Sequence, residues 1–161
     1  MLARRVDRQP SHALLRSGSA RRYCVVKPEV TDYVRYRVAR VYETLGDAEL
    51  LIENDRLHST VNRLHHACFY IVSALLLTTG LSSSKHTDVR ALSFQHCIKT
   101  GTFDRDLGRL YQRLYEPRQT SDYRDFTAFE RGDVVAWLEQ ARAFVARFDE
   151  EVQRNMEAED G

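Results

Sequence analysis

Cysteine is scarce in this chain, and its spacing excludes the usual cysteine-based sites. Cys24, Cys68 and Cys97 are odd in number and form no Cys-x-x-Cys pair. Two of them fall in apolar, helix-like surroundings, so we expect neither a disulfide framework nor a zinc-finger-type site. The pattern fits a reducing cytosol, and the N-terminus lacks the apolar segment of a secretory signal. We therefore predict a cytoplasmic protein.

Glycine-rich and metal-binding motifs are also missing. Only seven glycines occur in 161 residues, and no GxGxxG, Walker-type or GxSxG motif is present. There is no HExxH, and none of the Glu-x-x-His pairs that a di-iron bundle needs. His65 and His66 are adjacent, so their rings would diverge by about 100° on a helix and could not clasp one metal. We expect no metal and no cofactor.

The chain has neither a dominant charge nor a long apolar run. Its net charge is +1, so no overall field favours nucleic acid. The apolar run Ala67–Leu77 is too short to cross a bilayer, and no membrane association is expected. Residues 1–30 carry seven Lys/Arg against two Asp/Glu. We predict that they form a basic, disordered extension, with an RNA-binding arm or an organelle-type leader as alternatives.

Helical periodicity is abundant by contrast. Apolar residues recur every three or four positions in five segments, about 32–54, 57–79, 88–99, 103–116 and 131–155. The second segment carries two neighbouring apolar stripes, which predicts a helix covered on more than one side. No segment alternates as a strand does. We predict an all-α fold over residues 31–155, an antiparallel up-and-down helical bundle of four long helices plus one short helix, followed by an acidic tail at 156–161.

A polar pair at the start of the central apolar run marks a candidate site. Asn62 and Arg63 stand where burial should begin, and a charged side chain there needs a partner. We expect that partner in the loop after the fourth helix, which holds Arg118, Asp122 and Tyr123. One interpretation is a buried polar knot in which Arg63 pairs with Asp122. The other is a phosphate-handling site, because arginine forks match phosphate geometry.

The segment Val61–Tyr70, VNRLHHACFY, resembles the corresponding helix of small HEPN-domain proteins. Lys85 and His86 after the second helix, the segment KTGTFDRDLGRLYQRLYEPRQTSDY and the terminal amphipathic helix agree with that family in order. The similarity covers roughly residues 33–150. It implies a helical bundle that forms a homodimer and pairs, as a toxin, with a minimal nucleotidyltransferase antitoxin. Active members of the family are metal-independent ribonucleases with an Arg-x(4–6)-His motif.

The chain departs from that motif at its histidine. Arg118 stands in the motif place, but no histidine follows within six residues, and Asp122 and Tyr123 occupy the expected position. A tyrosine is a poor general base at neutral pH, since its reference pKa is about 10. The resemblance also implies that a tyrosine beside the motif can be adenylylated by the partner, and Tyr123 is the candidate here.

Other residues could support such a site. His66, Lys85 and His86 are candidates for binding or support, whereas His65 lies on an inward stripe and is predicted to be a core histidine. We predict a HEPN-type module that mainly dimerises and binds a partner or a nucleotide, with a degenerate ribonuclease motif. An active ribonuclease toxin using Arg118 on RNA is the alternative, and a purely structural bundle is the third option.

Overall fold

The computed structural model describes residues 28–116 and 128–158, and within them every regular element is a helix. The helices are α1 (Pro28–Glu53), α2 (Leu57–Thr78), α3 (His86–Ser93), a π-helical turn η1 (Phe94–Ile98), α4 (Arg105–Tyr115) and α5 (Arg131–Glu157). The predicted all-α bundle is confirmed. The predicted basic extension lies outside the described residues, apart from its last three positions, which belong to α1. Arg118, Asp122 and Tyr123 also lie outside them.

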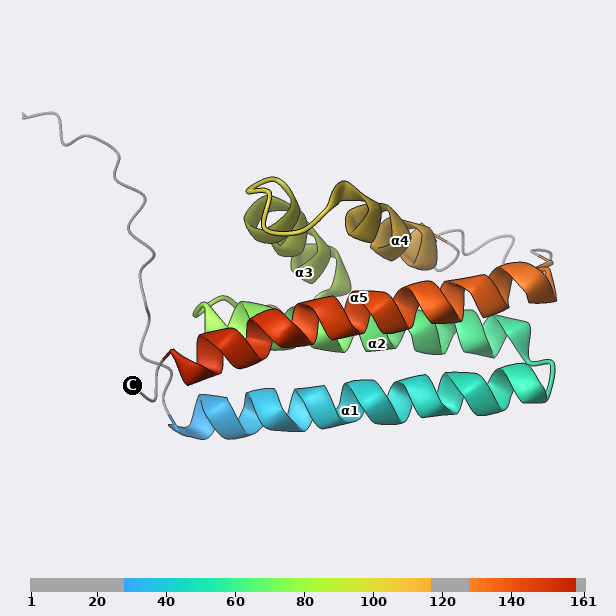
Figure 1. The fold of residues 1–161 in the computed structure, drawn as a ribbon, viewed down its shortest axis with the longest axis horizontal. Coiled ribbons are helices and arrows are strands. Elements are labelled where there is room, and N and C mark those ends of the chain that lie inside the picture. The colour runs from blue at the N-terminus through green and yellow to red at the C-terminus, as the bar shows by residue number, and fades with distance from the viewer. Residues whose placement is uncertain (1–27, 117–127, 159–161) are drawn as a thin grey trace, which may run out of the picture.

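The three longest helices lie side by side, and α3 and α4 lie across one face of them (Figure 1). Along the chain the direction alternates, so that α1 and α4 run one way and α2 and α5 the other (Figure 1). Helix α2 contacts α1, α3, α4 and α5. The two apolar stripes of α2 explain this central place, because each stripe is buried by a different set of neighbours.

Glycines end two of the helical segments where the sequence predicts. Gly80 follows α2 with a φ of 76°, and Gly101 follows η1 with a φ of 79°. At the end of α2 the N–H of Leu81 donates to the carbonyl of Leu76 over 2.9 Å, and the N–H of Gly80 donates to Leu77 over 3.1 Å. This paired closure needs a residue in the left-handed region, which glycine adopts without strain. The turn sends the chain back to start α3 across the bundle.

A stack of three phenylalanines anchors the layer of α3 and α4 to α5. The ring of Phe148 lies between the rings of Phe103 and Phe144, with centroids 4.0 and 4.3 Å away. Phe103 precedes α4, so this stack places the start of that helix on α5. Among the described helices, none combines the length and the apolar character needed to cross a lipid bilayer.

The helix predicted over 88–99 begins two residues earlier and ends differently. It is α-helical to Ser93 and then widens into the π-turn η1. The widened turn leaves Phe94 58% exposed while Cys97 and Ile98 are buried. Single π-turns interrupt the regular facing of side chains, which helical periodicity in a sequence does not reveal.

Candidate functional site

The predicted polar pair lies in the second turn of α2, where both side chains are half-buried. The backbone carbonyl of Asn62 lies 2.8 Å from Nδ1 of His66, one helical turn further on. This contact holds the His66 ring along the helix axis, on the side from which α3 approaches. The partner predicted for Arg63, Asp122, lies outside the described residues, so their pairing stays a prediction.

Helix α3 brings a second histidine to this place. His86 is the first residue of α3, and its ring stacks on Phe69 with centroids 3.9 Å apart. The His86 ring lies 5.6 Å from that of His66 and 5.3 Å from that of His65. Two of the predicted support residues, His66 and His86, are therefore neighbours. Lys85 occupies the N-cap position of α3 without a side-chain capping hydrogen bond, and it is exposed.

Helix α4 closes the other side of these rings. Tyr111 and Tyr115 lie with ring centroids 5.8 and 5.6 Å from that of His65, which is fully buried. We call His65, His66, His86, Tyr111 and Tyr115 the histidine–tyrosine cluster. Tyr115 stands three positions before Arg118, so the cluster adjoins the end of α4 from which the predicted motif follows.

The chemistry open to this cluster is limited by its composition. No carboxylate belongs to it, and in the described parts of the chain no group of three or more His, Cys, Asp or Glu side chains could hold a metal ion. Stacked rings in a buried setting are mainly a packing element. Histidine remains the side chain best suited to proton transfer near neutral pH, and His66 and His86 are only partly buried.

Thiol chemistry is disfavoured at the two described cysteines. Burial raises the pKa of the Cys68 thiol far above its ordinary value, and burial together with Glu151 raises the pKa of Cys97 to about 11. Both thiols are therefore protonated at neutral pH, and a thiolate is the form that acts as a nucleophile.

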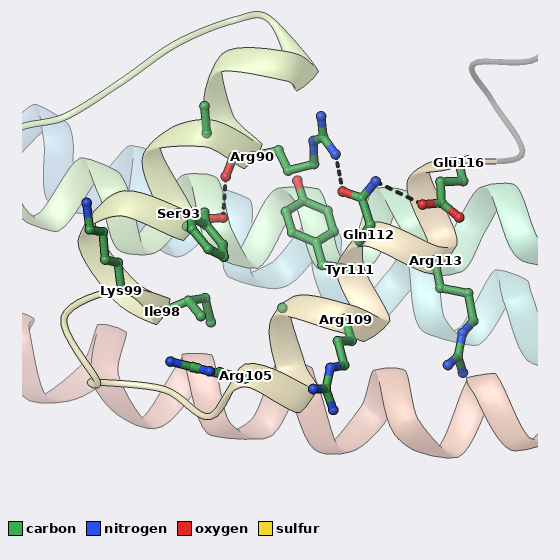
Figure 2. A pocket seen from close by; sticks show the side chains of 13 residues that line it. Arg90, Ser93, Ile98, Lys99, Arg105, Arg109, Tyr111, Gln112, Arg113 and Glu116 are labelled. Carbon is green, nitrogen blue, oxygen red and sulfur yellow. Dashed lines mark hydrogen bonds between the residues drawn. The ribbon is translucent and has the colours of Figure 1, made fainter.

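Sequence reasoning missed a groove between α3–η1 and α4 (Figure 2). Its volume is about 850 Å³. The only carboxylate among its lining residues in the described structure is Glu116, at one end. Five basic side chains from both walls line the groove, namely Arg90, Lys99, Arg105, Arg109 and Arg113. We call it the cationic groove.

The cationic groove and the histidine–tyrosine cluster share a wall. The guanidinium of Arg90 donates to the Gln112 side-chain oxygen, and its carbon lies 4.2 Å from the ring centroid of Tyr115. Gln112 in turn donates from Nε2 to Glu116 over 3.0 Å (Figure 2). Tyr111 belongs to the cluster and also lines the groove. The open groove and the largely buried cluster therefore adjoin each other along α4.

The fold and the site together define an all-α domain whose polar and cationic groups gather around its fourth helix. Comparison with known protein families identifies the family, because the family model described as "HEPN domain" matches residues 34–151. The chain belongs to the HEPN domain family. The resemblance seen in VNRLHHACFY is thereby confirmed.

Several curated proteins are similar to this chain. A "UPF0332 protein" of Thermotoga maritima is 44% identical over 119 residues, which cover 74% of this chain and 88% of that protein. A protein of Methanocaldococcus jannaschii named "Putative toxin MJ0142" is 31% identical over 53% of this chain and 58% of its own length. A "UPF0332 protein" of Pyrococcus horikoshii is 30% identical over 48% of this chain and 54% of its own length.

Proposed function

We propose that this HEPN chain acts mainly as a dimerising, partner- or nucleotide-binding module in a toxin–antitoxin-like system, with a degenerate ribonuclease motif. One observation carries the proposal: Arg118 stands in the motif place, but residues 119–124 contain no histidine. Without that ring, Arg118 can still bind a phosphoryl group, but the acid–base step lacks its usual group. The relative named "Putative toxin MJ0142" supports the setting.

The partner of this module would be a minimal nucleotidyltransferase acting as the antitoxin, and the module itself a cytoplasmic homodimer. In that setting Tyr123 is the modification site. Its hydroxyl oxygen would attack the α-phosphorus of ATP, gain an adenylyl group and release pyrophosphate, while the hydroxyl proton passes to solvent. Co-expression with a neighbouring nucleotidyltransferase should give a stable complex and a mass increase of one adenylyl group, absent from Tyr123→Phe.

RNA cleavage separates this proposal from its main alternative. The full chain, Arg118→Ala and a control, Arg35→Ala on the exposed face of α1, are incubated with labelled RNA in EDTA. We expect no cleavage by any of them. Cleavage by the full chain and the control but not by Arg118→Ala would overturn the degenerate-motif proposal and establish a metal-independent ribonuclease.

The alternative of an active ribonuclease rests on a specific observation, the meeting of His66 and His86 beside the end of α4. A ring contributed by α2 or α3 could replace the histidine missing from the motif. If so, His66→Asn or His86→Asn would strongly reduce cleavage, and the residual cleavage would lose its pH dependence near neutrality, because the titrating group would be gone. His96→Asn, at an exposed histidine of η1, is the matched control.

A further inference from the structure

The outer face of α1 carries exposed apolar side chains that the fold of a single chain leaves uncovered. Helix α1 packs against α2 and α5, and it lies on the side of the molecule away from α3 and α4 (Figure 1). We propose that this face binds a second copy of the chain, with the two α1 helices side by side and antiparallel about a two-fold axis. The inference rests on the proposed function in that the module dimerises, and it names the surface that does so.

One stripe of α1 forms this face. The buried residues Val34, Val41 and Ala48 lie on the inner side of the helix, against α2 and α5. The outward stripe recurs at intervals of three and four residues and consists of Tyr36, Ala39, Glu43, Gly46 and Leu50. Leu50 is 60% exposed and Tyr36 is 59% exposed, which makes them the two most exposed large apolar residues in the described parts of the chain. Apolar side chains at helical spacing usually mark a covered face, so α1 has one covered face and one that awaits a partner.

The stripe matches a second copy of itself when the pair is centred on Glu43. Tyr36 and Leu50 stand seven residues to either side of Glu43, so an antiparallel pair places Tyr36 of one copy opposite Leu50 of the other. Ala39 and Gly46 meet in the same way, four and three residues from the centre. Beyond the backbone of its own helix, no atom of the described structure lies within 4 Å of a Cβ placed on Gly46. Two backbones can therefore approach closely here, and alanine at position 46 would still fit.

Charge selects the antiparallel direction. The first half of α1, residues 28–41, holds three basic and two acidic side chains, whereas residues 42–53 hold four acidic side chains and no Lys or Arg. A parallel pair would set like charges against each other. An antiparallel pair sets the basic half of each copy against the acidic half of the other, which is the complementary arrangement. With the centre at Glu43, Arg40 of one copy lies opposite Asp47 of the second copy.

The centre itself brings two glutamates together, and the fold supplies their counter-ions. Arg40 donates to the Glu43 carboxylate over 2.6 Å, and these side chains are 39% and 61% exposed. Each copy therefore brings its own arginine to the axis, so the four side chains carry no net charge together. Apolar, small and charged positions are all matched by one two-fold centre, and such self-complementarity is what an interface between identical subunits requires.

This interface has a consequence for the candidate site. Because α1 lies away from α3 and α4, a pair joined through α1 leaves the cationic groove and the end of α4 uncovered in both copies (Figure 1). The two copies of the site would then face outward and act separately.

Sedimentation equilibrium tests the apolar contact. Leu50→Glu should raise the dimer dissociation constant by roughly tenfold or more, because each dimer would then bury two unpaired carboxylates. Val135→Glu is the matched control, since Val135 is an exposed apolar residue of α5, 40% exposed. It should leave the dissociation constant unchanged. Circular dichroism melts verify that both variants are folded. Equal dissociation constants for the two variants would overturn the proposal.

Disulfide crosslinking tests the direction and the centre of the pair. The background is Cys24→Ser, and the buried thiols of Cys68 and Cys97 are inaccessible. Glu43→Cys should crosslink to itself under mild oxidation, because its two copies meet at the axis. Ala39→Cys mixed with Gly46→Cys should give a mixed dimer, whereas each alone should give little. Efficient crosslinking of Ala39→Cys to itself and of Gly46→Cys to itself would indicate a parallel pair and overturn the proposal.

The outcomes separate this inference from the proposed function. A dimeric chain whose Leu50→Glu variant stays equally dimeric would place the dimer contact on another face, which overturns this inference alone. A chain that is monomeric at all concentrations would contradict dimerisation in the proposed function as well. The adenylylation and RNA-cleavage assays involve Tyr123 and Arg118, so their results do not depend on the outer face of α1.

Discussion

Two phenylalanines of this fold have opposite surroundings, one buried and one exposed. Their burial decides how much each contributes to stability. Phe148 is 1% exposed and is stacked on both sides, whereas Phe94 is 58% exposed on the rim of the cationic groove. The sequence predicts Phe148 as a core residue from its place on the stripe of α5. It does not predict the exposure of Phe94, because that follows from the π-turn.

The contrast gives a matched prediction of stability. Phe148→Ala should lower the free energy of unfolding by about 3–5 kcal/mol, because it removes a large buried ring and leaves a cavity. Phe94→Ala should change it by less than about 0.5 kcal/mol, as expected for an exposed position. Urea unfolding followed by circular dichroism measures both values. A similar loss for the two variants would contradict the burial seen here.

At the scale of the helices, the bounds of several helices follow closely from the local sequence. The second predicted helix, 57–79, differs from α2 by one residue, and the fifth, 131–155, begins where α5 begins. Apolar spacing and a glycine in the post-helix position are enough for this, because both act between near neighbours in the chain. The end of α1 adds a contact that is distant in sequence, in which Arg131 donates to the carbonyl of Ile52 over 2.8 Å.

Two glycines provide a prediction at this scale. Gly46 lies inside α1 with open space around the place of a Cβ, so Gly46→Ala should stabilise the fold by about 0.5–1 kcal/mol through helix propensity. Gly80 has a φ of 76°, so Gly80→Ala should destabilise it by about 1 kcal/mol. The melting temperatures should therefore move in opposite directions. If both substitutions moved the melting temperature in the same direction, the left-handed helix end assigned to Gly80 would be refuted.

For the whole molecule, the central position of α2 determines which helices resist local unfolding most strongly. Helix α2 is covered by four other helices, while α3 with η1 forms one wall of an open groove. Local opening costs least where few apolar groups are buried. Amide hydrogen exchange should therefore be slowest in the middle of α2 and faster in α3 and η1.

The sequence by itself determined the all-α class, the approximate helix bounds, the buried state of His65 and the departure of the motif at Asp122 and Tyr123. These depend on periodicity, turn chemistry and residue identity, which act locally. The tertiary structure alone decided that His66 meets His86 and that Arg90 and Lys99 face the arginines of α4. The row of arginines on α4 was readable from its four-residue spacing, but its facing wall was not. That wall depends on how side chains distant in sequence pack α3, η1 and α4 over α2, and no local pattern carries this information.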